Sequence, residues 1–282
     1  MPRFKQMPQA RIRIGEITVT AVSDGILKTG LDCIISLAPD ECARLAGSAY
    51  DAPIYLPVNT FLIDLAGRKV LVDAGAGNTM QPTLGKLPDN LRAMGVPPEA
   101  ITTILLTHLH PDHANGLTDG DGKAVFPNAE LIVHEQESRF YLERDANDGD
   151  SERVRRALVA SKHAVAPYRG RIRTVPDGEA LPGISAVLRP GHTPGHTCWL
   201  VQSGGSRLLI WGDIVHLPSV QVPRPDAALV YDVDPVLAPQ TRAQVFDWVA
   251  RERLPVAGAH MPDPGFATIT RQGGGYAYST AV

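Results

Sequence analysis

The sequence predicts a mixed α/β protein in which two groups of β-strands pack together with helices outside them. Short apolar runs rich in β-branched residues occur in an early group and a late group. Amphipathic stretches with helical spacing lie between and after these runs. The chain has 282 residues, 44% of them hydrophobic, which suits one globular domain spanning residues 1–282.

Each expected strand is an apolar run bounded by turn residues. The segment 17–22 alternates in polarity as a half-buried strand does. The segments 60–64 and 69–73 read as a strand pair joined by a turn at 66–68. The run 101–107 leads directly into a His-rich loop. The late group consists of the runs 184–189, 206–210 and 254–257.

Four segments favour helix. They are residues 86–95, the stretch after Pro97-Pro98-Glu99, the run from Ser151 through His163, and residues 235–252. The apolar positions of the last of these are Val236, Leu237, Val245, Trp248 and Val249. The glycine-containing segment 75–91 is either a mobile lid over the site or an ordinary surface loop.

Composition excludes several classes of protein. A formal net charge of −3 gives no basic footprint for nucleic acid. No apolar run approaches the roughly 20 residues that span a bilayer, and the charged start at residues 1–6 lacks the apolar region of a secretory signal. Cys33, Cys42 and Cys198 form no CxxC pair, which is typical of reduced thiols. We therefore expect a cytoplasmic protein without nucleic-acid or membrane partners.

The segment His108-Leu109-His110-Pro111-Asp112-His113 concentrates imidazoles and a carboxylate on one tight loop. Ordinary packing cannot satisfy so many donor side chains there, whereas N and O ligands at this spacing suit borderline metals such as zinc. His192, Asp213 and His260 each follow another apolar run and a turn residue. Strand ends that carry ligands in this way converge on one edge of a layered core, so the sequence predicts a metal centre at that edge.

This order of residues, HxHxDH followed by His, Asp and His, resembles the metallo-β-lactamase superfamily from about residue 11 to about residue 270. The resemblance implies a four-layer αββα sandwich and two divalent metal ions, with Zn²⁺ expected first and Mn, Co or Fe also compatible with N/O ligands. Carried over, it assigns His108, His110 and His192 to the first metal, Asp112, His113 and His260 to the second, and Asp213 to a bridge between them.

The resemblance also implies outer residues that orient the ligands. Asp73 matches an early aspartate at a strand end and is expected to fix the ligand loop through hydrogen bonds. His196 follows His192 in the segment GHTPGH and either donates a hydrogen bond that orients a ligand or is a packed structural histidine.

Candidate pocket residues are less well defined. Phe140, Tyr141 and His216 fall where they could line a substrate pocket, although a buried helix face explains Phe140 and Tyr141 equally well. His134 and His163 have no motif partner.

The implied chemistry is hydrolysis by a hydroxide that bridges two metals, with Asp112 handling the proton. Several segments are similar to the methyl-parathion-hydrolase-like branch, which holds phosphotriester hydrolases and lactone or aryl-ester hydrolases: 22–25, 57–61, 211–216, 220–222, 231–235, 256–266 and 273–276. Phosphotriester specialists of that branch have aromatic pockets, and this chain is only 6% aromatic. We therefore rank lactones or carboxylic (aryl) esters first and phosphotriesters second.

Two further alternatives remain at this point. A thioesterase similar to glyoxalase II shares the GHTPGH segment, but here only a short Gly-rich segment follows His260 in place of a helical extension. A non-catalytic metal-binding protein is the alternative from a different class, and the complete ligand set argues against it. The expected partner is a small-molecule ester, lactone or phosphotriester, and a homodimer is compatible with the resemblance.

Overall fold

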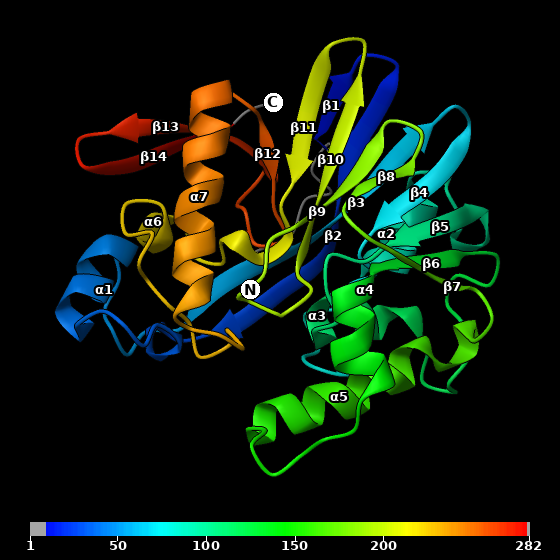
Figure 1. Cartoon of the computed structure of the whole chain (residues 1–282), viewed down its shortest axis with the longest axis horizontal. Coiled ribbons are helices and arrows are strands. Elements are labelled where there is room, and N and C mark those ends of the chain that lie inside the picture. Colours follow the sequence, from blue (N-terminus) through cyan, green and yellow to red (C-terminus); the bar gives the residue numbers. More distant parts are fainter. Residues whose placement is uncertain (1–9, 281–282) are drawn as a thin grey trace.

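The computed structural model describes residues 10–280 and contains two seven-stranded sheets flanked by helices (Figure 1). The first sheet has the order β1-β2-β3-β4-β5-β6-β7 and the second has the order β14-β13-β12-β11-β10-β9-β8. Each sheet is therefore built from one continuous half of the chain. The predicted grouping of the strands into two packed sheets is confirmed.

The strands of the first sheet are β1 (Arg11–Ile14), β2 (Ile17–Thr29), β3 (Ile54–Leu65), β4 (Arg68–Val72), β5 (Ile101–Leu105), β6 (Glu130–His134) and β7 (Ile172–Val175). Those of the second are β8 (Gly178–Leu181), β9 (Ile184–Leu188), β10 (Thr197–Ser203), β11 (Ser206–Ile210), β12 (Val256–Ala257), β13 (Phe266–Gln272) and β14 (Gly275–Thr280).

The helices are α1 (Pro39–Ala46), α2 (Leu87–Ala93), α3 (Pro111–Ala114), α4 (Glu135–Ser138), α5 (Glu152–Val165), α6 (Pro218–Gln221) and α7 (Leu237–Glu252). Short 3₁₀ turns cover Leu31–Cys33, Pro98–Ala100, Asn115–Leu117, Ala166–Tyr168 and Gly212–Ile214, and a π-turn covers Arg139–Glu143.

Alternation of side chains along the strands creates the layers. In β4, Val70 and Val72 join the cluster between the two sheets, together with Trp199 and Ile210 of the second sheet. Leu71, between those two valines, points to the opposite face and packs in a cluster with residues of α2 and α5. This is the period-2 pattern of a strand that is buried on both faces.

Helix α7 covers the outer face of the second sheet. Its residues Val245, Phe246 and Val249 share a cluster with Leu209 of β11 and Val256 of β12. In Figure 1, α7 (orange) stands beside β12, while α4 and α5 (green) lie with the first sheet at the lower right. The order helix, sheet, sheet, helix is the predicted αββα sandwich, and that prediction is confirmed.

Two local predictions are wrong. The stretch after Pro97-Pro98-Glu99 forms only the 3₁₀ turn Pro98–Ala100, because the apolar run from Ile101 is the buried central strand β5. Val236 is 70% exposed because it precedes the first turn of α7 and lies off its apolar stripe.

The segment 75–91 is held at its base by the buried carboxylate of Asp24. Asp24 Oδ2 accepts hydrogen bonds from the backbone N–H groups of Ala76 (2.9 Å) and Gly85 (3.1 Å). Asp24 Oδ1 accepts a hydrogen bond from Leu87 N (3.0 Å). Burial raises the pKa of Asp24, although these donors act in the opposite direction. The role of this segment as a lid stays a prediction.

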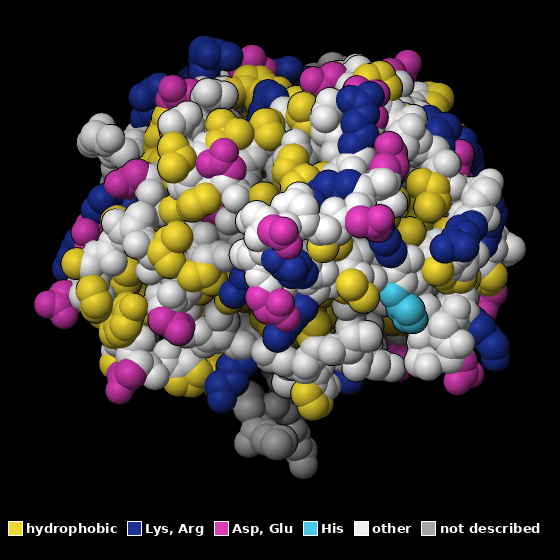
Figure 2. Space-filling model, turned by 60° about the horizontal axis from the view of Figure 1, so that its bottom comes forward, with side chains coloured by type: hydrophobic (Ala, Val, Ile, Leu, Met, Phe, Trp, Pro, Cys, Tyr) yellow, Lys and Arg dark blue, Asp and Glu magenta, His cyan; other side chains and the backbone are white. Residues whose placement is uncertain are grey.

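Other predictions concern the surface and the termini. Lysine and arginine, aspartate and glutamate, and hydrophobic side chains are interspersed over the face shown in Figure 2. No helix in residues 10–280 has the length and apolar character needed to cross a bilayer. Cys33, Cys42 and Cys198 are buried free thiols. Residues 1–6, where a secretory signal was not expected, lie outside the described residues.

Strand direction brings the functional loops together. Strands β4, β5 and β6 run parallel, and so do β11 and β12. The carboxyl ends of parallel strands meet at one edge of a sheet, where ligands bind in layered α/β folds. Asp73, the loop 108–113, Asp213 and His260 follow β4, β5, β11 and β12 respectively, so one rim of the sandwich carries them all.

Candidate metal centre

The structure brings all seven predicted ligands together in two neighbouring clusters. One cluster contains His108, His110 and His192, and the other contains Asp112, His113, Asp213 and His260. Within each cluster the potential ligand atoms lie within 4.8 Å of one another. A further set joins His192 and Asp213 to His216, which was predicted only as a pocket residue.

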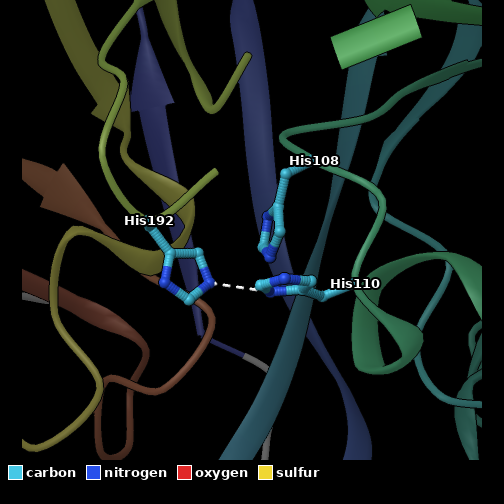
Figure 3. Close-up of side chains that lie close together, drawn as sticks. All are labelled: His108, His110 and His192. Atoms are coloured by element: carbon cyan, nitrogen blue, oxygen red, sulfur yellow. Dashed lines mark hydrogen bonds between the residues drawn. The ribbon is translucent and has the colours of Figure 1, made fainter. Parts of the chain in front are cut away.

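In the three-histidine cluster, Nδ1 of His110 lies 2.9 Å from Nε2 of His192 (Figure 3). The ring of His108 meets both other rings edge-on, with interplanar angles of 80° and 82°. His110 forms the N-terminal boundary of α3, where Pro111 begins the helix with its fixed φ. The short helix thereby turns Asp112 and His113 toward the second cluster.

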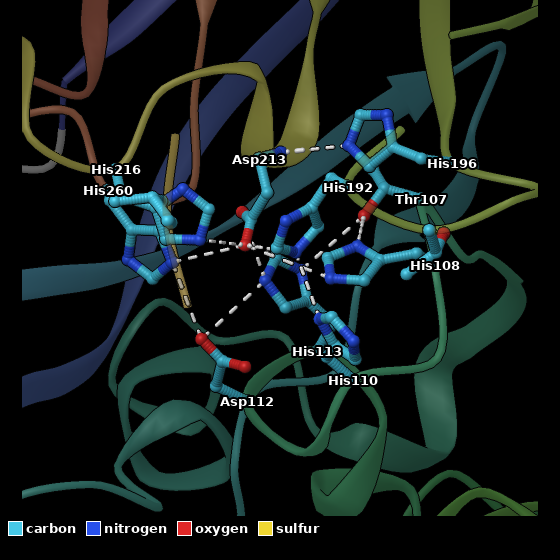
Figure 4. Close-up of polar contacts among 12 residues, drawn as sticks. Thr107, His108, His110, Asp112, His113, His192, His196, Asp213, His216 and His260 are labelled. Atoms are coloured by element: carbon cyan, nitrogen blue, oxygen red, sulfur yellow. Dashed lines mark hydrogen bonds and ion pairs between the residues drawn. The ribbon is translucent and has the colours of Figure 1, made fainter. Parts of the chain in front are cut away.

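Asp213 lies between the two clusters (Figure 4). Its Oδ2 is 3.4 Å from His192 Nε2 and 3.8 Å from His108 Nε2. The same carboxylate reaches the second cluster, with Oδ1 3.1 Å from His113 Nε2 and Oδ2 3.4 Å from His260 Nε2. Oδ2 of Asp112 lies 3.4 Å from His260 Nε2. One carboxylate therefore contacts histidines of both clusters.

Each of the five histidines has its second ring nitrogen held by an outer partner. The contacts are His108 Nδ1 with Thr107 Oγ1 (3.1 Å), His110 Nε2 with the Tyr141 hydroxyl (3.1 Å), His113 Nδ1 with Asp73 Oδ2 (2.8 Å), His192 Nδ1 with Asp232 Oδ1 (2.9 Å) and His260 Nδ1 with Pro57 O (2.8 Å). Such contacts fix the tautomer and the ring orientation of metal-binding histidines. They leave the remaining five nitrogens turned toward the centre.

Asp73 ties this shell to the sheet. Its φ of 61° places it in the left-handed region at the end of β4, which aspartate tolerates better than most residues. Besides His113, its carboxylate accepts hydrogen bonds from Thr107 N and Thr107 Oγ1, both at 2.7 Å. Because Thr107 Oγ1 gives its hydrogen to Asp73, it is free to accept one from His108 Nδ1.

Several outer residues were not predicted from the sequence, among them the buried carboxylates Asp232 and Glu137. Asp232 accepts from His192 Nδ1 and also from Leu229 N at 2.9 Å. Glu137 is fully buried and contacts Leu109, Thr193 and Gly195. Asp232 follows no strand, and Glu137 sits in a charged segment that resembles an exposed helix, so neither carried a local signal.

His196 and His216 both contact Asp213, one through its backbone N–H and the other through its carboxylate. Nε2 of the buried His196 accepts a hydrogen bond from the backbone N–H of Asp213 (3.0 Å), whereas the two alternatives expected were a donor to a ligand and a packed structural histidine. His216 Nε2 lies 2.9 Å from Asp213 Oδ2, and its ring stacks on that of His260. Burial lowers the pKa of His216 to about 4, so the ring is neutral and Nε2–H donates to the carboxylate.

Of the other predicted pocket residues and the unassigned histidines, only Tyr141 has a described contact with a predicted ligand. Tyr141 is buried and reaches His110. Phe140 packs on Tyr141 and lies 4.1 Å beneath the guanidinium of Arg144, and none of its described contacts involves a predicted ligand. His134 precedes α4 and accepts a hydrogen bond from Gln136 N (3.2 Å), which is a structural capping role. His163 is exposed.

Charge in the centre is distributed unevenly. Burial holds the pKa of His108 and of His110 well below the usual range, so these rings are neutral and able to ligate. Burial acts in the same direction on His113 and His260, but the surrounding carboxylates outweigh it. They raise the pKa of His113 well above its usual value and that of His260 to about 10.

The residues present fit a divalent metal. Nε2 of His108, His113 and His260 and Oδ1 of Asp213 are buried without a hydrogen-bond partner, although carboxylate oxygens lie within ion-pair distance of all three histidines. These atoms are directed at a shared space and not along hydrogen bonds to one another. Unsatisfied buried polar atoms are costly, and imidazole nitrogens with carboxylate oxygens are a donor set that zinc and similar ions accept.

The fold and this centre define a class: an αββα sandwich with a divalent-metal site of histidine and aspartate on one rim. A family model described as the metallo-beta-lactamase superfamily matches residues 54–272. The chain belongs to this superfamily, as the sequence predicted.

Comparison with individual proteins gives lactonases and hydrolases. The N-acyl homoserine lactonase of Bacillus thuringiensis is 25% identical over 175 residues, covering 55% of this chain and 62% of that protein. The N-acyl homoserine lactonase AiiB of Agrobacterium fabrum is 33% identical over 125 residues, covering 35% of this chain and 43% of that protein. The chain thus spans less than two thirds of the length of these curated relatives.

Solved structures match over nearly the whole chain. The hydrolase AbOPH in the beta lactamase superfamily has a TM-score of 0.89 at 30% identity and covers 99% of both chains. AidC, a dizinc quorum-quenching lactonase, has a TM-score of 0.90 at 24% identity and covers 97% of both chains. The second likeness supports the fold alone.

Proposed function

We propose that this protein is a metal-dependent hydrolase of lactones or carboxylic esters with a dinuclear centre. In this proposal His108, His110 and His192 hold one ion, Asp112, His113 and His260 hold the other, and Asp213 bridges them. The observation that carries the proposal is the position of Asp213, whose carboxylate lies 3.1–3.8 Å from histidine nitrogens of both clusters. Zn²⁺ is the ion we expect, since the ligand set is nitrogen and oxygen.

The chemistry follows from the donor set and from the position of Asp112. Two divalent ions in such a site lower the pKa of water enough to give hydroxide near neutral pH and polarise the substrate carbonyl. The Asp112 side chain is 13% exposed against 2% for Asp213, so it is the carboxylate at the open side of the centre. We assign Asp112 to proton transfer: it takes the proton released as the C–O bond to water forms and gives it to the alkoxide as the ester C–O bond breaks.

Outer residues keep the ligands in position during this cycle. Asp73 and Asp232 each hold a histidine of a different cluster through its Nδ1. His216 donates to Asp213 and keeps that carboxylate oriented between the clusters. Ligands pre-oriented in this way need no reorganisation when charge develops on the substrate oxygen.

Lactones rank first because the named curated relatives are N-acyl homoserine lactonases. A lactone and an aryl ester present the same carbonyl electrophile, so pocket shape decides between them. A phosphotriester also asks for hydroxide attack and a stabilised oxyanion, and it is the second substrate to test.

The test is kcat/KM of the zinc-loaded protein on an acyl-homoserine lactone, an aryl carboxylic ester and an aryl phosphotriester. We expect a value of at least about 10⁴ M⁻¹s⁻¹, the lower end for evolved enzymes, on the lactone or the carboxylic ester. Activity on the phosphotriester alone would replace the proposed substrate class. No turnover of any of the three by fully zinc-loaded protein would refute the proposed function.

A further inference from the structure

A buried carboxylate outside the ligand set joins the two loops that carry the three-histidine cluster. Glu137, in α4, has no exposed surface. Its Oε1 accepts a hydrogen bond from Leu109 N at 2.8 Å. Its Oε2 accepts from Thr193 Oγ1 at 2.7 Å and from Gly195 N at 3.0 Å.

The positions of these donors are specific. Leu109 lies between His108 and His110, and Thr193 directly follows His192. All three histidines of the first cluster are therefore next to a residue that Glu137 holds. Among the described residues, Glu137 forms no hydrogen bond to the loops or strand ends that carry Asp213 or His260.

The loop that carries His192 packs directly against the backbone of α4 at Gly195. A Cβ added to Gly195 would lie 2.0 Å from Glu137 N and 2.4 Å from its Cα, so only glycine lets the loop approach this closely. Burial raises the pKa of Glu137 to about 7, while the three donors and the nearby ring of His192 act in the opposite direction. The carboxylate is thus placed for its acceptor oxygens and not for an ion pair.

We propose that Glu137 is a positioning residue that holds the loops of His108, His110 and His192 in their metal-binding arrangement and thereby sets the affinity of that ion more strongly than that of the other. Two ligands proposed for the other ion, Asp112 and His113, share the loop of Leu109, whereas Asp213 and His260 lie on segments that Glu137 does not hold. This inference rests on the proposed function, because it assumes that the three histidines bind an ion. Loss of outer contacts that orient metal ligands typically weakens metal binding about 10- to 100-fold.

The substitution Glu137→Gln tests this with almost no change in volume. A carboxamide presents one acceptor oxygen and one donor NH₂. If the oxygen faces Leu109 N, the NH₂ faces the Gly195 N–H; if it is reversed, the NH₂ faces the Leu109 N–H. Either orientation places two donors together, so one loop must move away.

Asp24→Asn is the matched control. Asp24 is also fully buried and also accepts three hydrogen bonds, from Ala76, Gly85 and Leu87, but these residues carry no proposed ligand. Both variants lose a buried carboxylate, so both should lower the melting temperature of the metal-free protein. Only Glu137→Gln should change metal binding.

The measurement is equilibrium Zn²⁺ binding by competition with a chelating dye, followed by the absorption spectrum of the cobalt-substituted protein. We expect Glu137→Gln to bind one of two ions about 10- to 100-fold more weakly and to change the cobalt spectrum, while Asp24→Asn matches wild type in both. Should Glu137→Gln not fold, Thr193→Val removes one donor alone and is expected to weaken the same ion by a smaller factor.

Unchanged affinity for both ions in Glu137→Gln overturns the inference, and so does an equal loss in Asp24→Asn. In either case a wild-type protein that still binds two ions leaves the proposed function in place. A wild-type protein that binds no ion refutes the proposed function itself.

Discussion

Replacing Asp232 by asparagine changes one atom of the shell around His192 and should weaken one metal site. The carboxylate accepts from His192 Nδ1 and from Leu229 N, both at 2.9 Å. Burial favours a higher pKa for Asp232, but the hydrogen bond and charge interaction with His192, the charge of Arg242 and the hydrogen bond from Leu229 N together outweigh it and hold the pKa below the usual value. Asp232 is therefore charged, and His192 carries its proton on Nδ1, leaving Nε2 as the ligand atom.

In Asp232→Asn the amide oxygen can serve only one of these two donors. If it accepts from Leu229 N, the NH₂ faces His192 Nδ1, and the proton of His192 must move to Nε2, the nitrogen that points into the centre. If it accepts from His192, the NH₂ collides with the Leu229 N–H. A lost hydrogen bond to a charged group is worth about 1.5–3 kcal/mol, which corresponds to about 10- to 100-fold in affinity.

The assay is competition of metal-free protein with a chelating dye for Zn²⁺, with the affinities of the two ions fitted separately. Asp234→Asn is the control, because Asp234 Oδ1 accepts from Val236 N and Leu237 N at the start of α7 and asparagine serves as well in that position. We expect one weakened ion in Asp232→Asn and none in the control. A folded Asp232→Asn protein with wild-type affinity for both ions would show that the tautomer argument is incorrect.

Three further predictions concern the centre itself. Asp213→Ala removes the carboxylate that contacts both clusters and should lose at least one ion together with activity; metal analysis showing two ions and normal turnover would contradict the bridge. Asp112→Asn removes the proton-transfer group and should lower kcat by about 10²-fold or more with little change in KM, so an unchanged kcat in steady-state kinetics would remove Asp112 from the mechanism. Since the pKa of His260 is raised from 6.5 to about 10 in the metal-free protein, its proton stabilises the fold fully below pH 6.5, and this contribution is lost as pH rises through about 10. Calorimetry should then show the melting temperature of metal-free protein falling between pH 7 and 10, and a flat profile there would count against the carboxylate environment assigned to His260.

The convergence of the seven proposed ligands was predictable because their loops follow strands that the sequence marks clearly. A buried strand rich in β-branched residues precedes His108, and buried strands also precede Asp213 and His260. Residues that act across the fold were not predictable. Glu137 meets Gly195 only because α4 packs under a loop from the other half of the chain, and no local pattern records that contact.

The errors in secondary structure have similar causes. The helix expected after Pro97-Pro98-Glu99 does not form, because the run from residue 101, itself predicted as a strand, begins directly after the turn as β5 in the middle of the first sheet. Strand β2 continues to Thr29, well past the predicted 17–22, because an irregularity between Ser23 and Gly25 keeps the chain paired with β3 beyond the break in its alternation.

The division of the chain into two successive sheets has a consequence for biosynthesis. Strands β1–β7 are complete at Val175, and by then a nascent chain carries His108, His110, Asp112 and His113. His192, Asp213 and His260 are translated only afterwards, with the second sheet. Under the proposed assignment each ion takes ligands from both halves of the chain, so its full coordination requires that both sheets have been synthesised and assembled.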